Sequence, residues 1–112
     1  MDASDALELR RALRDFELAL GFLPGHLGYG LVKACVDSGV KLVDVSYMPE
    51  DPMTMDERAL EAGVTIIPDC GVAPGLSNIL VGRSVQKFEV RSIHILYWRN
   101  PSKGLNLPLD IL

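Results

Sequence analysis

The side chains most able to do chemistry gather in three short segments of this 112-residue chain. The segments are LPGH (23–26), SYMPEDPMT (46–54) and DCGVAPG (69–75). The third contains Cys70, and a cysteine acts as a nucleophile when a base within hydrogen-bond reach takes its proton. The two histidines, His26 and His94, are far apart in sequence, and no spacing pairs either of them with Cys70. An independent thiol enzyme is therefore a minor alternative.

Asp44 raises a different question because it stands in an apolar, strand-like stretch. A buried carboxylate is costly unless it is hydrogen-bonded. We therefore favour a structural role, in which backbone N–H groups of neighbouring loops bind Asp44. Tyr47 and Asp51 either face a ligand or are ordinary loop residues, and the sequence leaves both interpretations open. Cys35 is expected on a helix, with its side chain in the hydrophobic core of the domain. His94 is expected to have a structural role.

The composition narrows the class of partner. The net charge is -4, the pI is about 5.0 and no Lys/Arg cluster is present, which argues against a nucleic-acid partner. No apolar run approaches the roughly 20 residues that span a bilayer, so no membrane partner is expected. No His/Cys cluster has zinc spacing, so no metal site is predicted. Two cysteines fit a reducing compartment better than a disulfide framework, and we expect a cytoplasmic protein.

The hydrophobic pattern predicts alternating helices and strands. Helices are expected near 5–15, 27–37, 54–62 and 75–85, and strands near 17–22, 41–47, 64–68 and 89–98. Asp5 with Glu8 and Thr54 with Glu57 have capping-box spacing, and Gly39 stands where a helix should end. The strands lack polar–apolar alternation, which is typical of a parallel sheet covered on both faces. The predicted fold class is α/β, a Rossmann-like parallel sheet with helices on both faces.

The three segments follow predicted strands, so they are expected at the carboxyl edge, where open parallel sheets bind ligands. Proline fixes φ and glycine lets the backbone approach closely, which suits a ligand-facing rim as well as plain turns. Gly28 and Gly30 are interpreted as positions of close helix–sheet packing. The N–H of Gly25 can face an anion at a helix start. The chain has neither Gly-x-Gly-x-x-Gly nor a P-loop, so no motif of its own supports dinucleotide binding.

Two long strings carry a family resemblance. LPGHLGYGLVKACVDSGVKLVDVSYMPEDP (23–52) and LEAGVTIIPDCGVAPGLSNILVG (60–82) resemble the saccharopine dehydrogenase-like family, and within it the lysine 6-dehydrogenase-type members. Such proteins look like two-domain NAD(P)-dependent oxidoreductases. Their Rossmann domain binds the dinucleotide, and a second α/β domain shapes the amino-acid site and often the dimer interface. The resemblance implies hydride transfer between a nicotinamide and a carbon that bears an amine or imine.

The resemblance also implies site residues. Asp2 would face the adenine end of NAD or NADP. The residues expected along the cofactor between ribose and nicotinamide are Leu23, Pro24 and Gly25, and those on the nicotinamide side are Val45, Ser46 and Tyr47. The residues expected at the reaction site and the crossover to the second domain are Asp69, Cys70, Gly71, Pro74 and Gly75. Tyr47 and Cys70 are the implied catalytic residues.

The same resemblance predicts the domain organisation. Residues 1–68 are expected to be the C-terminal half of a Rossmann domain, 69–98 the first helix and strand of a catalytic and dimerisation domain, and 99–112 an irregular tail. The family's glycine-rich first βαβ unit has no counterpart in this sequence. A truncated or split enzyme of lysine- or saccharopine-like substrates is therefore expected, inactive alone and with weak NAD(H) binding. The alternative is a non-catalytic α/β module that associates through an exposed sheet edge. Exposed strands also favour a homodimer or other self-association.

Overall fold

A computed structural model describes residues 1–96 of the chain. The chain divides into two compact units, Met1–Leu76 and Ser77–Leu112. The predicted tail at 99–112 and the last two residues of the predicted strand at 89–98 lie outside the described residues.

The first unit is built on three parallel strands in the order β1 (Leu18–Gly21), β2 (Lys41–Asp44) and β3 (Ile66–Ile67). Leu42 of the central strand pairs with Ala19 on one side and with Ile66 on the other. Because the strands run in the same direction, their carboxyl ends lie at one edge of the sheet. The predicted parallel, Rossmann-like α/β fold is confirmed.

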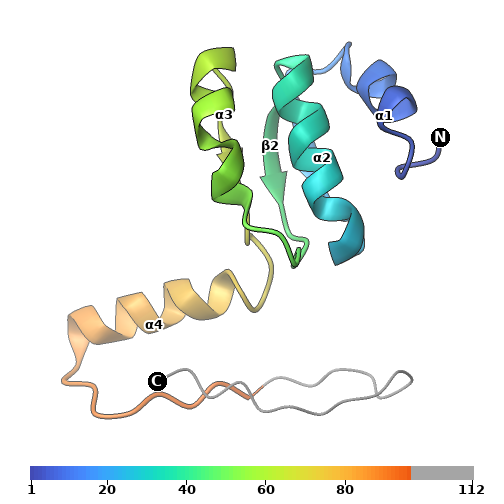
Figure 1. Ribbon diagram of the computed structural model, residues 1–112. Helices are drawn as coiled ribbons and strands as arrows, with labels where there is room; N and C mark the ends of the chain where they lie inside the picture. The colour runs from blue at the N-terminus through green and yellow to red at the C-terminus, as the bar shows by residue number, and fades with distance from the viewer. Residues whose placement is uncertain (97–112) are drawn as a thin grey trace, which may run out of the picture. The chain divides into compact units, whose positions relative to one another are not determined.

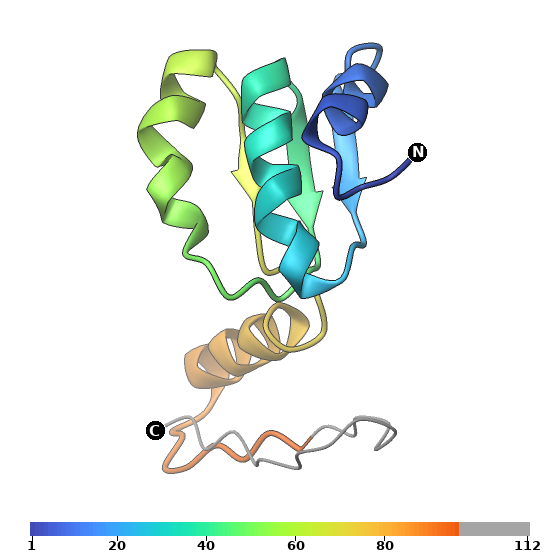
Figure 2. The same ribbon diagram turned by 45° about the vertical axis from the view of Figure 1, so that its right-hand side comes forward.

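Helices α1 (Ala6–Leu13), α2 (Gly25–Ser38) and α3 (Asp56–Ala62) lie on the same face of this sheet (Figure 1, Figure 2). The described residues therefore differ from the prediction of helices on both faces. Right-handed crossovers from β1 to β2 and from β2 to β3 step across the sheet in the same direction, which puts both connecting helices on one side. On the other side, Leu18 and Leu20 of β1 are 53% and 62% exposed.

The core lies between the sheet and the helices, with α2 in the middle. Cys35 of α2 and Leu42 of β2 are fully buried in one apolar cluster, so the predicted core position of Cys35 is confirmed. Burying a leucine of this kind contributes about 1.5–3 kcal/mol. At the end of α2, the carboxylate of Asp37 forms ion pairs with Arg10 of α1 and Arg58 of α3. One carboxylate thus joins three helices.

Two of the helix ends follow from single residues that the sequence pointed to. The carboxylate of Asp5 accepts hydrogen bonds from the backbone N–H groups of Leu7 and Glu8, and α1 begins there as predicted. Gly39 ends α2 in the left-handed region, with φ of 72°. A side chain is unfavourable at that φ, which explains the glycine.

The predicted capping box at Thr54 is wrong. A 3-10 turn, η1 (Pro52–Met55), comes first, and α3 begins only at Asp56. Asp51 caps this turn by accepting a hydrogen bond from Met53 N at 2.9 Å. The Thr54 hydroxyl donates to the Asp51 carbonyl at 2.8 Å, and Thr54 lies inside this turn, so the N-cap of α3 is Met55, which makes no side-chain cap bond.

The second unit contains α4 (Leu76–Lys87), which starts at the last residue of the first unit and has no buried residue. The predicted strand at 89–98 is not found in its described part, because residues 89–96 pair with no other described segment. The prediction that His94 lies in a strand is therefore wrong. No helix within residues 1–96 is long and apolar enough to cross a membrane.

Candidate functional site

The carboxyl edge of the sheet is held together by main-chain hydrogen bonds that continue the strand pairing. Val45 N donates to Gly21 O at 3.0 Å, which joins the end of β1 to the segment after β2. Cys70 N donates to Asp44 O at 2.8 Å, which joins that segment to the loop after β3. The segments that begin the second and third loops are therefore fixed to one another and to the end of β1.

The first loop, 23–26, packs directly against the second loop because Gly25 has no side chain. A Cβ on Gly25 would overlap the carbonyl of Tyr47, so the backbones of the two loops touch at this point. Leu23 is half-buried against the core cluster, and Pro24 occupies the N-cap of α2 without a side-chain cap bond. The predicted close packing holds for Gly28, which is buried against Ser46.

Gly30 differs from the prediction made for it. A Cβ on Gly30 would meet no atom within 4 Å, because this position faces away from the sheet. The spacing of two residues on a helix rotates the second position well away from the first, so one face cannot include both.

The third loop, 69–75, is a tight backbone structure closed on itself. Gly71 forms an isolated parallel bridge with Gly75, and Leu76 N donates to Gly71 O at 2.9 Å. Gly75 has φ of 128°, and Asp69 has φ of 57°. A Cβ on Gly71 would lie 3.2 Å from the carbonyl oxygens of both Pro74 and Val45, so this loop also lies close to the residue just before the second loop.

The two predicted catalytic side chains lie on this edge but have no catalytic partner among their recorded contacts. Tyr47 is 72% exposed. The thiol of Cys70 is exposed and makes long contacts with the carbonyls of Ile67 at 3.7 Å and Pro68 at 3.6 Å. A carbonyl cannot take the thiol proton, so the described contacts offer no activation of Cys70.

Asp44 and Ser46 form the buried polar part of the edge, with exposures of 0% and 4%. The Ser46 hydroxyl donates to Asp44 Oδ2, and Asp44 Oδ1 has no hydrogen-bond partner within residues 1–96. The prediction that backbone N–H groups bind this carboxylate is wrong, since its donor is a hydroxyl two residues along the chain.

Burial, and secondly the charge of Asp44, raise the pKa of Cys35 to about 11.

The hydrogen bonds given for Asp2 are with residues near the start of the chain and with none of the three loops. Its carboxylate accepts from the backbone N–H of Ser4 at 2.8 Å and from the Ser4 hydroxyl at 2.7 Å. The hydroxyl bond, followed by the backbone bond, lowers the pKa of Asp2. Asp2 N donates to Glu8 Oε2 at 2.8 Å. These contacts hold the start of the chain against α1.

The charge of the carboxyl edge limits which chemical groups can bind there. The loops at 23–26, 46–54 and 69–75 contain the acids Glu50, Asp51 and Asp69 and no Lys or Arg. Phosphate groups bind to cations and to backbone N–H clusters, so an acidic rim disfavours them. The close backbone approaches at Gly25 and Gly71 are contacts with carbonyl groups of the chain itself, so these two glycines allow the loops to pack together.

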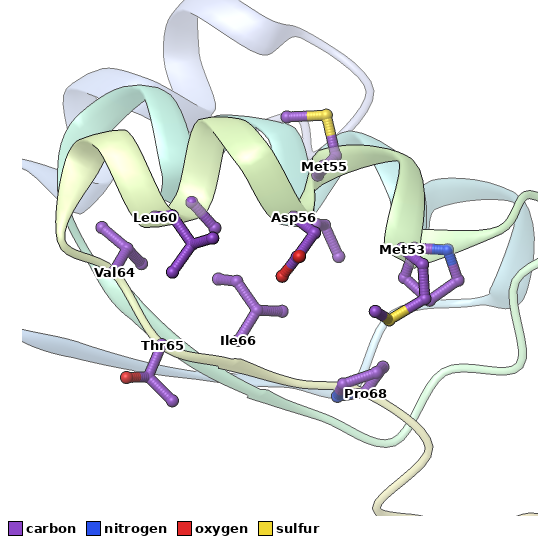
Figure 3. Close-up of a pocket in the computed structure, with 11 residues that line it drawn as sticks. Met53, Met55, Asp56, Leu60, Val64, Thr65, Ile66 and Pro68 are labelled. Atoms are coloured by element: carbon purple, nitrogen blue, oxygen red, sulfur yellow. The ribbon is translucent and has the colours of Figure 1, made fainter.

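A separate cavity of about 220 Å³ lies between α3 and β3, and sequence reasoning missed it (Figure 3). Its walls are mostly apolar, and the carboxylate of Asp56 points into it beside Leu60 and Ile66 (Figure 3). None of the predicted site residues lines it. Among the described residues, no group of three or more His, Cys, Asp or Glu is placed to hold a metal ion.

Comparison with known proteins decides the family. Residues 1–67 match the family described as Saccharopine dehydrogenase NADP binding domain. The chain belongs to this family. NADP, or NAD, is thus the cofactor of the full-length members, and the oxidoreductase class is that of the family. Among residues 1–67 are the first two loops of the carboxyl edge, whereas the third loop lies beyond the match.

Individual relatives agree with the family match. Rat mitochondrial alpha-aminoadipic semialdehyde synthase is 30% identical over 80 residues, which are 71% of this chain and 9% of the rat protein. Fission-yeast saccharopine dehydrogenase [NADP(+), L-glutamate-forming] is 22% identical over 110 residues, which are 98% of this chain and 24% of that protein. The chain thus spans a quarter or less of these relatives.

A solved structure supports the fold. The apo form of saccharopine dehydrogenase (L-Glu forming) from Saccharomyces cerevisiae superposes with a TM-score of 0.68 at 20% sequence identity. The match covers 78% of this chain and 20% of the yeast chain. At this level of identity the likeness concerns the fold alone.

Proposed function

We propose that this chain forms the nicotinamide-side rim of an oxidoreductase site that acts on the CH–NH group of an amino acid. The observation that carries the proposal is the carboxyl edge itself, where three proline-containing loops are fixed to one another by main-chain bonds and close packing. This is the edge at which open parallel sheets bind ligands. The names of the relatives support a lysine- or saccharopine-like substrate.

Each loop has a part in this proposal. The backbone of residues 23–25 lies along the ribose, and Val45 and Tyr47 approach the nicotinamide side. The loop at 69–75 forms the wall beside the reaction site and, in the proposed domain organisation, begins the crossover to a second domain. Tyr47 is the stronger candidate for substrate contact, because an exposed phenol both donates and accepts hydrogen bonds. The bound nicotinamide supplies hydride exchange with the amine-bearing carbon.

The remaining candidates have less support from contacts. Cys70 is exposed at the rim without a base, and Asp2 is proposed on the resemblance alone. The edge lacks a cationic phosphate site, so we propose that the chain binds NADP weakly and is inactive by itself. A cytoplasmic location belongs to the same proposal.

The test is an NMR titration of the whole chain with two halves of the cofactor. Nicotinamide riboside, which has no phosphate, should shift the amides of Gly25, Tyr47 and Gly71 at millimolar concentration. Adenosine should not shift them, and the amide of Leu9 in α1 should respond to neither compound. If nicotinamide riboside leaves the three loop amides unmoved, the proposed rim is wrong. Calorimetry that gave a micromolar dissociation constant for NADPH would contradict the weak binding.

A second candidate function is a non-catalytic α/β module that associates through its sheet. The observation that favours it is the exposed apolar side of β1, where Leu18 and Leu20 are 53% and 62% exposed and Phe22 beyond them is 72% exposed. Parallel sheets normally bury both faces, and an apolar edge strand invites pairing. The expected form is self-association through β1.

Sedimentation velocity tests this second candidate directly. Wild type should sediment as a dimer or larger species at high concentration, and Leu20→Lys should shift it toward the monomer. Leu7→Lys, the same substitution at a 57% exposed leucine of α1, is the control for a general change in surface charge. A monomeric wild type across the concentration range would rule the module out and leave the cofactor proposal untouched.

A further inference from the structure

Burying the carboxylate of Asp44 costs free energy in so small a core. Asp44 is fully buried at the end of β2, and among the described residues it has one hydroxyl donor and its Oδ1 has no hydrogen-bond partner. A buried carboxylate with so little compensation is a poor source of stability. Apolar residues of similar size would cost less at this position. The contribution of Asp44 must therefore be looked for in what it holds in place.

Asp44 touches the loops on both sides of its own strand. Its carbonyl accepts the Cys70 N–H at 2.8 Å, so it fixes the entry to the third loop. Its unpartnered Oδ1 fills the space in which Gly21 of β1 would carry a Cβ. Its Oδ2 accepts the Ser46 hydroxyl and so ties the first residue of the second loop to the end of β2. One side chain therefore contacts the ends of β1 and β2, and its backbone reaches the loop after β3.

Ser46 is held from the other side by α2. Its hydroxyl occupies the space in which Gly28 would carry a Cβ, and the next residue, Tyr47, places its carbonyl in the corresponding space at Gly25. The Ser46 side chain is only 4% exposed as a result. A hydroxyl in this position cannot reach a ligand on the rim.

We propose that Asp44 is a positioning residue, which acts through Ser46 to set the backbone of residues 45–47 and the start of the loop at 69–75. The inference rests on the proposed function for its purpose, since the positioned atoms are those of the nicotinamide-side rim. Ser46 then serves the rim indirectly instead of by direct cofactor contact. Tyr47 faces outward because its own carbonyl is seated at Gly25.

The test compares Ser46→Ala with the double variant Asp44→Asn/Ser46→Ala by urea unfolding and by amide hydrogen exchange. Ser46→Ala removes the donor of a buried carboxylate, so both stability and the order of the rim should fall. In the double variant, the neutral amide needs no compensation for charge, and most of the lost stability should return. The positioning bond is still absent, so the Cys70 amide should keep exchanging about tenfold faster than in wild type, relative to the Leu42 amide.

Asp37→Asn provides the matched control. It weakens the helix ion pairs away from the rim, and it should lower stability without a selective increase in exchange at Cys70. If rim exchange recovers together with stability in the double variant, or if Ser46→Ala leaves it unchanged, Asp44 is merely structural and the inference is overturned. If wild type shows no loop shifts with nicotinamide riboside, the proposed function fails while the exchange result still decides the role of Asp44.

Discussion

Substitution of Gly28 by alanine tests the packing between α2 and the second loop. Both Gly28 and Gly30 lie inside α2, so alanine is the better helix former at either position. At Gly28 the new Cβ would overlap Ser46 Oγ, and it would lie 3.1 Å from Ser46 Cβ and 3.3 Å from Met48 Cε. At Gly30 it would meet no atom within 4 Å. The two substitutions are chemically identical and differ only in what the methyl group contacts.

The expected magnitudes follow from these contacts. Overpacking a buried site costs about 1–3 kcal/mol. Displacing the Ser46 hydroxyl leaves Asp44 without its donor, which costs about 1–3 kcal/mol more. Higher helix propensity returns about 0.5–1 kcal/mol. Gly28→Ala should therefore lower the free energy of unfolding by about 1–5 kcal/mol, whereas Gly30→Ala should raise it by about 0.5–1 kcal/mol.

Urea unfolding followed by circular dichroism measures both changes against wild type. The variant Gly28→Ala/Ser46→Gly supplies a double-mutant cycle, because removing the Ser46 side chain also removes the overlap. The combined loss should then be smaller than the sum of the single losses. Equal stabilities for Gly28→Ala and Gly30→Ala would show that α2 does not pack on Ser46 as described, and the positioning role of Asp44 would lose its support as well.

Two further predictions concern the core and the helix layer. Burial raises the pKa of the Cys35 thiol from 9.0 to about 11, so the thiol form stabilises the fold below pH 9 and that stabilisation is lost as the pH rises toward 11. Alkylation with iodoacetamide at pH 8 should modify Cys70 and spare Cys35, and modification of both at similar rates in the folded chain would contradict this burial. Asp37→Ala should cost about 1 kcal/mol in low salt, because its arginine partners are 42% and 50% exposed, and less in high salt. Urea unfolding at two salt concentrations measures this, with exposed Glu61→Ala as the control, and a loss independent of salt would argue against the ion pairs.

Features that depend on local sequence were predictable. Asp5 caps a helix because its side chain reaches N–H groups two and three residues away, and Gly39 ends one because of its own φ. The parallel order followed from the spacing of apolar segments and from the handedness of crossovers. The predicted cap at Thr54 was wrong because Asp51, three residues earlier, caps the 3-10 turn η1, and Thr54 lies inside that turn.

Features that depend on distant pairs were not predictable. The inward rotation of Ser46 requires Gly28 opposite it, eighteen residues earlier in the chain, and the space for Asp44 Oδ1 requires Gly21 on the neighbouring strand. No periodicity in either segment reveals these partners, because they depend on how α2 is set on the sheet. A family pattern points to the segment VSY, but it does not say which of its side chains faces the ligand.

The open face of the sheet connects the two candidate functions. A parallel sheet is normally covered on both sides, and here the helices of the first unit cover one side while Leu18, Leu20 and Ile67 remain 47–62% exposed. An element that covered this face or paired with β1 would also lie beside the carboxyl edge, which has acids in its loops and no cation for a phosphate. Association through β1 and completion of a cofactor site are therefore compatible outcomes of one surface. A partner that supplies cationic or glycine-rich backbone at this edge should raise NADP affinity and reduce the exposure of β1 together.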